Sequence, residues 1–334
     1  MSQAGAFPYQ GNEFQVEKHR VMQFFLIANL SFNQIPKIMI GFFLYLISLI
    51  PLRILYFISD FLAFLLYYVF KYRRRVVAEN IKKSFYTLTN NERIVLEKEF
   101  YKVFSDNFME TIKLLSISER KLLSYISADY SQLEKILAEN QNCHIYLGHQ
   151  FNWEWAIAHM TLVQKKAEVL LVYKTSRSHI VNDLMLRIKS RFGSKIVESE
   201  NMKKEMEQFS GSPHIVIVLA DQNPKFPSKS YWLSFLSQRT AFLSDVELNT
   251  ADYKTPSLFA NIIREKRGRY KIILEPIFDF TEPYKRRILT NIFVEKLENA
   301  IISNPENYLW SHKRWKHKYK NEYRKRWINK TSKV

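Results

Sequence analysis

The most apolar stretch of the chain runs from Ile38 to Phe70, and few polar residues interrupt it. It is longer than the roughly 20 residues that one helical bilayer crossing needs. Pro51 and Arg53 divide it into two apolar runs of similar size, so the pattern leaves two arrangements open, one kinked span or a pair of partly interfacial helices. A buried core helix is the alternative, and the cations that follow the stretch favour the membrane.

Those cations are Lys71 and Arg73–Arg75, directly after the apolar stretch. A cationic flank of this kind is retained on the cytosolic side of a membrane. Residues 1–36 lack the small-residue cleavage site of a secretory signal peptide. We therefore expect a leader over residues 1–36, a membrane anchor over 37–70, and a cytosol-facing domain over 71–334.

Beyond the anchor, the periodicity of the apolar positions changes along the chain. Apolar residues at steps of three and four between Phe100 and Leu115 predict an amphipathic helix that begins near Thr89–Glu92. Helical stretches such as Ile180–Phe192 then alternate with short β-branched runs. These runs predict strands at His144–Leu147, Val169–Tyr173, Ile215–Leu219 and Tyr270–Ile277, with a further element at Ser257–Ile263. The predicted fold class is α/β, with a mixed central sheet flanked by helices.

Composition narrows the class of protein. An apolar content of 47% provides enough material for a large core, and the single cysteine, Cys143, excludes an intramolecular disulfide. Fifty Lys and Arg residues against 32 Asp and Glu give a net charge of +18, which attracts anionic partners. Nucleic acid, anionic lipid and an acidic carrier protein are all anionic partners that this charge would attract.

Two polar clusters follow predicted strands, where active residues of α/β proteins commonly lie. His149 comes after the first of these strands and Asp221 after the third. Glu154 is five positions beyond His149, and this spacing brings the two side chains together only if the chain bends from strand to helix. We expect Glu154 to accept a hydrogen bond from one ring nitrogen of His149, which makes His149 a general base for a substrate hydroxyl.

A metal site is the alternative for this region, because His144, His149 and His159 are close in sequence. A strand places His144 and His149 in different local geometries, and neither a second cysteine nor an HExxH pattern accompanies them. We therefore expect no metal and no cofactor.

The segment GHQFNWE at 148–154 resembles the H-x4-D/E signature of the bacterial lipid A late acyltransferases, in the lysophospholipid acyltransferase superfamily. Phe151 stands where glycine is common in that signature. Further features occur in the family's order over residues 37–320. They are YRR and EN at 72–74 and 79–80, RFG at 191–193, ADQNP at 220–224 and YLWSHKR at 308–314. The resemblance implies a glycerol-phosphate acyltransferase-like fold.

The resemblance also implies roles for individual residues. His149 and Glu154 would be the catalytic pair, with His149 removing the proton of an acceptor hydroxyl as it attacks an acyl thioester. Substrate binding would fall to the matching motif positions Asn152, Lys189, Arg191, Asp221 and Gln222. Lys189 takes the position of the family's basic residue, but a lysine cannot form the bidentate clamp of an arginine, so Arg191 is the alternative cation.

A basic, aromatic tail closes the chain. Lys313–Lys330 holds nine Lys or Arg residues with four interleaved Trp and Tyr rings and a single acid, Glu322. Taken alone, this mixture suits RNA or DNA, but it equally suits the headgroup zone of an anionic leaflet or a solvated helical face. The apolar anchor favours lipid over nucleic acid as the partner of the tail, so we expect no nucleic-acid partner.

The resemblance, taken with the apolar anchor and its cationic flank, implies an acyltransferase of the bacterial inner membrane with its catalytic domain facing the cytosol. The expected donor is an acyl carrier protein thioester, and the expected acceptor is a hydroxyl of an anionic glycolipid, a lipid A precursor. An aminolipid, a lysophospholipid or another glycolipid is the alternative acceptor. A non-catalytic membrane-binding or nucleic-acid-binding protein that has kept the fold is the alternative from another functional class.

Overall fold

The computed structural model describes residues 35–140, 142–175, 178–209, 211–244, 254–281, 284 and 287–328. Most of the expected leader and the last residues of the tail, 329–334, lie outside the described residues. The chain divides into two compact units, residues 1–46 and residues 47–334, and everything below concerns the second unless stated otherwise.

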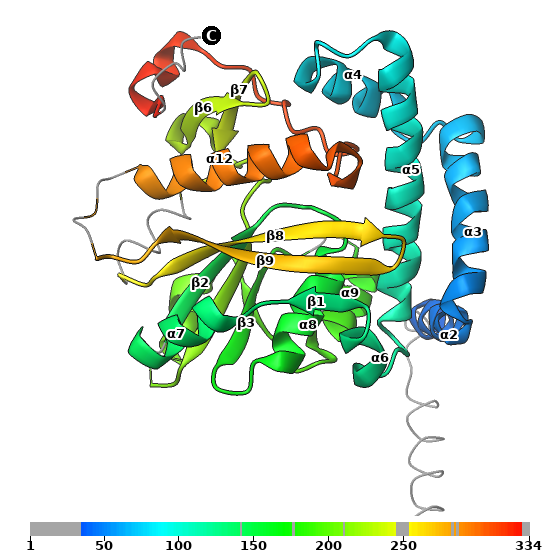
Figure 1. Ribbon diagram of the computed structural model, residues 1–334, viewed down its shortest axis with the longest axis horizontal. Coiled ribbons are helices and arrows are strands. Elements are labelled where there is room, and N and C mark those ends of the chain that lie inside the picture. The colour runs from blue at the N-terminus through cyan, green and yellow to red at the C-terminus, as the bar shows by residue number, and fades with distance from the viewer. Residues whose placement is uncertain are drawn as a thin grey trace, which may run out of the picture. The chain divides into compact units, whose positions relative to one another are not determined.

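A seven-stranded sheet forms the centre of the second unit, with strand order β1-β9-β8-β2-β5-β3-β4 (Figure 1). Its neighbouring strands are parallel except for the antiparallel pair β8 and β9, which confirms the predicted mixed sheet. The strands are β1 (Ile126–Ala128), β2 (Asn142–Leu147), β3 (Glu168–Tyr173), β4 (Lys195–Glu198), β5 (His214–Leu219), β8 (Ser257–Lys266) and β9 (Arg269–Phe278).

Strands β2 and β5 are direct neighbours although 72 residues separate their paired positions. Asn142 pairs with His214 at one end of the ladder and Leu147 with Leu219 at the other. Because the two strands are parallel, their carboxyl ends lie side by side at one edge of the sheet. The segments that follow β2 and β5 therefore begin close together.

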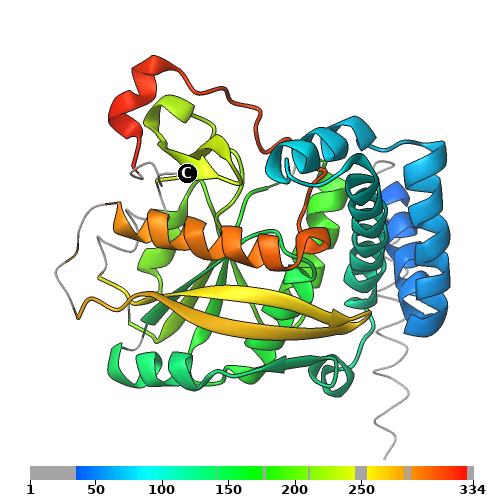
Figure 2. The ribbon, with the colours of Figure 1, turned by 45° about the horizontal axis from the view of Figure 1, so that its top comes forward.

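Helices cover both faces of the sheet (Figures 1 and 2). Alternate residues of β2 enter different cores: Ile145 and Leu147 pack in the cluster that includes α8, while Tyr146 packs in the cluster that includes α12. The helices of the second unit that follow the anchor region are α4 (Arg74–Ser84), α5 (Asn90–Lys113), α6 (Glu119–Leu123), α7 (Ser131–Asn140), α8 (Trp153–Val163), α9 (His179–Ser190), α10 (Met202–Glu207) and α12 (Ile288–Ser303), with short turns η2 (Pro227–Lys229), η3 (Pro305–Asn307) and η4 (Asn321–Arg326).

The predicted start of the long amphipathic helix is confirmed by a capping box at the beginning of α5. The Thr89 hydroxyl accepts a hydrogen bond from the amide of Glu92, and the Glu92 carboxylate accepts one from the amide of Thr89. This reciprocal pair satisfies amide groups that the first helical turn leaves without partners.

The apolar stretch is helical on both sides of Pro51. α2 (Ile35–Leu49) precedes it, and α3 (Leu52–Phe64) continues into the π-helical turn η1 (Leu65–Val69). Among the described residues, Leu52–Val69 is the one helical segment long and apolar enough to cross a membrane. One side of α3 packs on α5, and the other exposes Phe57, Phe61 and Phe64.

A second, two-stranded sheet consists of β6 (Tyr231–Phe235) and β7 (Gln238–Phe242), which form a hairpin. No sequence pattern predicts it. Hairpin turns with positive φ are usually signalled by Gly, Asn or Asp, but here Leu236 and Ser237 adopt φ values of 47° and 60°. The hairpin packs under the C-terminal tail, where Tyr323 stacks on Trp232.

Candidate active site

His149 and Asp221 meet at the carboxyl ends of β2 and β5. The Nδ1 atom of His149 lies 2.5 Å from Oδ1 of Asp221, and the backbone amide of His149 donates to Oδ2 at 3.0 Å. Both residues are buried. Asp221 thus holds both the ring and the backbone of His149.

The surroundings of Asp221 keep its carboxylate charged. Burial alone raises the pKa of this carboxyl, but the charge and hydrogen bonds of His149, together with the buried guanidinium of Arg314, hold the pKa well below its ordinary value of 3.8. Arg314 is fixed by hydrogen bonds to the side chain of Asn223 and to the carbonyl of Ala241. A charged carboxylate beside Nδ1 assigns the proton of a neutral imidazole to that nitrogen.

The other ring nitrogen of His149 faces Gln222. Its Nε2 atom lies 3.0 Å from Nε2 of Gln222, which donates to it in this tautomer. The ring edge also contacts the indole of Trp153, with a distance of 5.0 Å between ring centroids. His149 therefore presents an unprotonated nitrogen that can take a proton from a substrate group.

Glu154 lies in the first turn of α8, as expected, but its partner is different from the predicted one. Both carboxylate oxygens accept from Nζ of Lys189 at 2.7 Å, and Oε1 also accepts from the indole N–H of Trp153 at 2.8 Å. The expected hydrogen bond from His149 to Glu154 is wrong in this structure, because Nδ1 is taken by Asp221. Glu154 reaches His149 only through Trp153.

The two candidate cations, Lys189 and Arg191, have separate environments. Lys189 is buried at the end of α9 beside Glu154. Arg191 instead donates to the backbone carbonyls of Leu114 and Ile117, just after α5. Of the two, only Lys189 joins the cluster that contains Trp153 and His149.

Asn152 stands at the junction between the His149 loop and α8. Its side-chain oxygen caps the helix by accepting from the amide of Trp155 at 3.0 Å, and its amide group donates to Glu110 at 2.9 Å. The structure thus gives Asn152 a role in holding the bend between His149 and Glu154. A substrate contact for Asn152 stays a prediction.

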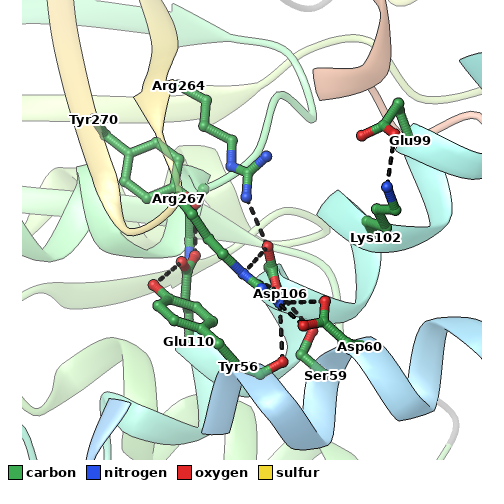
Figure 3. A network of polar contacts seen from close by, with 11 residues as sticks. Tyr56, Ser59, Asp60, Glu99, Lys102, Asp106, Glu110, Arg264, Arg267 and Tyr270 are labelled. Carbon is green, nitrogen blue, oxygen red and sulfur yellow. Dashed lines mark hydrogen bonds and ion pairs between the residues drawn. The ribbon is translucent and has the colours of Figure 1, made fainter. Parts of the chain in front are cut away.

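Glu110 of α5 is fully buried and was not singled out from the sequence (Figure 3). Its carboxylate accepts hydrogen bonds from the hydroxyls of Tyr56 and Tyr270, at 2.8 and 2.7 Å. It also accepts the hydrogen bond from the side-chain amide of Asn152. Burial raises the pKa of Glu110, and the three neutral donors oppose this rise. Glu110 therefore connects α3, β9 and the loop that carries His149.

One helical turn away on α5, Asp106 gathers two arginines from the tip of the β8–β9 hairpin (Figure 3). Arg264 and Arg267 both reach its buried carboxylate at 2.6 Å, and Ser59 of α3 donates to it at 2.7 Å. Arg267 also pairs with Asp60 of α3. These contacts fasten α3 to α5 and to the β8–β9 hairpin of the central sheet.

The three histidines considered for a metal have unrelated partners. The Nδ1 atom of His159 lies 2.9 Å from the hydroxyl of Tyr130, whereas His144 is buried within β2 and His149 pairs with Asp221. Burial lowers the pKa of His159 to about 4. Within the described ranges, no group of three His, Cys, Asp or Glu residues is placed to hold a metal ion.

Two other sequence features meet each other beside the site. Arg73 and Asn80, from the YRR and EN segments around α4, donate to backbone carbonyls of the YLWSHKR segment, including those of Trp310 and Ser311. His312 of that segment lies 3.2 Å from Asn223, close to Gln222. Side chains spread over the whole chain therefore converge around His149.

One family model matches the chain over most of its length. The family model described as bacterial lipid A biosynthesis acyltransferase matches residues 33–317. No curated protein matches the chain at a meaningful level. The family match includes the His149 loop, Lys189, Asp221 and the segment around His312. Because it spans most of the chain, the protein belongs to the bacterial lipid A biosynthesis acyltransferase family and is an acyltransferase.

Proposed function

We propose that this enzyme transfers a fatty acyl chain from an acyl carrier protein thioester to a hydroxyl of a lipid A precursor, as a late acylation step. The family supports an acyltransferase that acts on lipid A. The observation that carries the proposed chemistry is the buried His149–Asp221 pair, whose Nε2 atom faces Gln222.

In the proposed reaction, Nε2 of His149 removes the proton of the acceptor hydroxyl while the oxygen attacks the thioester carbonyl. Asp221 fixes the tautomer and stabilises the imidazolium that forms. The tetrahedral intermediate then collapses with cleavage of the carbon–sulfur bond. The thiolate leaves as a thiol after it takes the proton from Nε2, so His149 returns to its neutral form.

Glu154 and Lys189 act beside this pair. Glu154 holds the Lys189 ammonium and the Trp153 indole, which in turn contacts the His149 ring. We assign Lys189 to the negative charge that develops on the thioester oxygen or to a phosphate of the acceptor. Gln222, already within hydrogen-bond distance of Nε2, is displaced by the incoming hydroxyl and then donates to it.

We propose that α3 attaches the enzyme to the cytosolic face of the bacterial inner membrane by lying in the interface. Its inner side is fastened to the amphipathic helix α5 by hydrogen bonds from Ser59 and Tyr56, whereas its outer side exposes phenylalanine rings such as Phe57. A helix with one apolar side and a polar neighbour suits the boundary of the bilayer. Lys71, exposed two residues beyond η1, adds attraction to anionic lipid.

The enzyme's role is tested by the lipid composition of a deletion strain. We expect mass spectrometry to show lipid A that lacks one acyl chain, restored by the native gene but not by a His149→Ala variant. In membranes with purified protein, His149→Ala should reduce acyl transfer by about 10²–10⁴-fold.

His159→Phe serves as the matched control, because this buried histidine contacts Tyr130 and lies away from Asp221. It should retain transfer once its fold is verified. Unchanged lipid A together with an altered aminolipid in the deletion strain would assign the enzyme to another acceptor. Transfer by His149→Ala at the native rate would disprove the role of His149 as the base.

A further inference from the structure

The C-terminal tail separates its aromatic side chains from its cations. Tyr319 and Tyr323 contact the ring of Trp232, and Trp327 contacts Tyr319, so these rings face the β6–β7 hairpin. The indole N–H of Trp315 donates to Thr240 of the same hairpin. The expectation that the rings of this tail reach a lipid headgroup zone therefore loses its support, because the rings are used in folding.

The cations of the tail remain at the surface. We define the basic tail surface by the exposed side chains of Lys313, Lys316, Lys318, Lys320, Arg324 and Lys325. Among the described residues, the one carboxylate within ion-pair distance of these six is Glu322, 3.6 Å from Lys320. This surface thus has an excess of positive charge that the fold does not neutralise.

The basic tail surface begins next to the candidate active site. Asn223 follows Gln222 and donates to the carbonyl of Lys313 at 2.6 Å, and His317 lies 3.1 Å from the carbonyl of Pro224. A partner bound to the tail therefore sits beside the loop that faces Nε2 of His149. In both Figures 1 and 2, η4 and α3 lie at opposite ends of the second unit.

We propose that the basic tail surface is the docking site for the acidic carrier protein that delivers the acyl thioester. This inference rests on the proposed function for the donor and adds the place where the donor binds. Three observations favour a protein over a bilayer: the cations are solvated, the aromatic rings pack on the β6–β7 hairpin or on one another, and the surface lies away from the exposed rings of α3. Opposite charge on the carrier would accelerate encounter and orient its acyl arm towards His149.

The test measures binding of acyl carrier protein to the full-length enzyme in neutral detergent, with reversal of three tail charges. A Lys316→Glu, Lys318→Glu, Lys325→Glu variant should raise the Kd for the carrier by about tenfold or more. The matched control reverses Lys135, Lys165 and Lys166, which are also exposed but precede β2 and β3, at the amino ends of these strands. The control should stay within about twofold of the native Kd.

Kinetics with two donors separates docking from chemistry. The tail variant should show a raised KM for the carrier-bound acyl group and an unchanged kcat and KM for the same acyl group on pantetheine. For the native enzyme, added salt should weaken carrier binding and leave the pantetheine reaction nearly unaffected. Thermal unfolding checks that both triple variants are folded, and the salt dependence of the native enzyme tests the proposal without any variant.

Equal carrier binding by the tail variant and the control overturns the inference. So does a tail variant that loses binding to anionic phospholipid vesicles while its affinity for the carrier is unchanged, because the surface then serves the membrane. If the native enzyme binds the carrier through this surface but transfers no acyl group, the proposed function fails and the docking site stands. If the enzyme transfers the acyl group from pantetheine but does not bind the carrier, the docking site fails and the acyl-transfer activity stands.

Discussion

Asp221 and Glu110 are two buried carboxyl groups near the same loop, and their surroundings differ in one respect. Asp221 has cationic neighbours, His149 in its charged form and Arg314, whereas the three hydrogen-bond donors to Glu110 are neutral. Burial opposes the charged form of both. The pKa of Asp221 nevertheless lies below its ordinary value, and that of Glu110 lies above its own.

This difference assigns different work to the two groups. Asp221 stays charged when His149 gains a proton, so it can stabilise an imidazolium during a reaction. Glu110 supplies acceptor oxygens that organise Tyr56, Asn152 and Tyr270. At Asp221 the charge matters most, and at Glu110 the pattern of hydrogen bonds does.

The strongest way to break the comparison is to remove the charge at each position. Asp221→Asn keeps the shape but loses the charge, and the amide can no longer match both hydrogen bonds from His149. We expect acyl transfer to fall by roughly 10²–10⁴-fold, because the imidazole loses its fixed tautomer and its counter-charge. Glu110→Gln should retain most of the activity. Steady-state kinetics on both variants decides, and similar losses would show that the two carboxyls do the same work.

A third buried carboxylate, Glu154, extends the comparison because it also has a cationic partner. Lys189→Met leaves Glu154 buried with the Trp153 indole as its remaining donor, and we expect a loss of about 3–5 kcal/mol in the free energy of unfolding. Lys195→Met is the matched control, since it removes an ion pair with Glu168 whose side chains are 51% and 38% exposed, and it should change stability by less than about 1 kcal/mol.

Denaturant titration of the two lysine variants measures this difference. A Glu154→Gln change added to Lys189→Met should recover part of the loss, because it removes the buried charge that has lost its partner. Equal small losses from the buried and exposed pairs would contradict the burial argument.

Truncation of the Glu110 side chain tests its role as a hydrogen-bond acceptor. Glu110→Ala leaves the donors of Tyr56, Asn152 and Tyr270 without their buried partner, and we expect a loss of about 1–3 kcal/mol in unfolding free energy. Glu110→Gln should cost less than about 1 kcal/mol, since its oxygen replaces one acceptor and its amide group can donate to a tyrosine hydroxyl. Thermal or chemical denaturation would distinguish the two, and equal losses would mean that the charge of Glu110 is needed.

The last comparison concerns the pH dependence of stability. Because burial raises the folded-state pKa of Glu110, its stabilising contribution is fully present below 4.5 and is lost as the pH rises through that pKa. Relative to Glu110→Gln, the native protein should therefore lose about 1.4 kcal/mol for each pH unit between the unfolded and folded pKa values. The contribution of Asp221 has the opposite sign, being present above 3.8 and lost as the pH falls. Denaturation of both proteins from pH 4 upward measures the slope.

Much of this fold could be predicted because its strands are short, apolar and β-branched. The patterns at His144–Leu147 and Ile215–Leu219 locate the last residues of β2 and β5, and they place the first residues two positions late for β2 and one position late for β5. The β6–β7 hairpin could not be predicted because its turn consists of Leu236 and Ser237, neither of which signals a positive φ. Local signals thus predict an element only where local chemistry dictates its conformation.

The candidate site shows a similar division. His149 and Asp221 could be identified separately, since each follows a predicted strand, but their pairing depends on the placement of β5 beside β2. Nearness in sequence favoured Glu154 as the partner of His149. In the structure, Glu154 instead accepts hydrogen bonds from Lys189, which lies thirty-five positions further along the chain. Sequence patterns do not reveal the order of strands in a sheet, so they could not assign the partners.

The hydrogen bond from the amide of Ala220 to the carbonyl of Leu147, at 3.0 Å, continues the β2–β5 ladder up to the site itself. His149 and Asp221 follow directly, so the sheet holds them together before any substrate arrives. Deuterium should therefore replace the amide hydrogen of Ala220 only through the rare openings that expose the central strands. The His149–Asp221 pair should therefore persist for as long as the core stays folded. Heating should then abolish catalytic activity and unfold the core in a single transition.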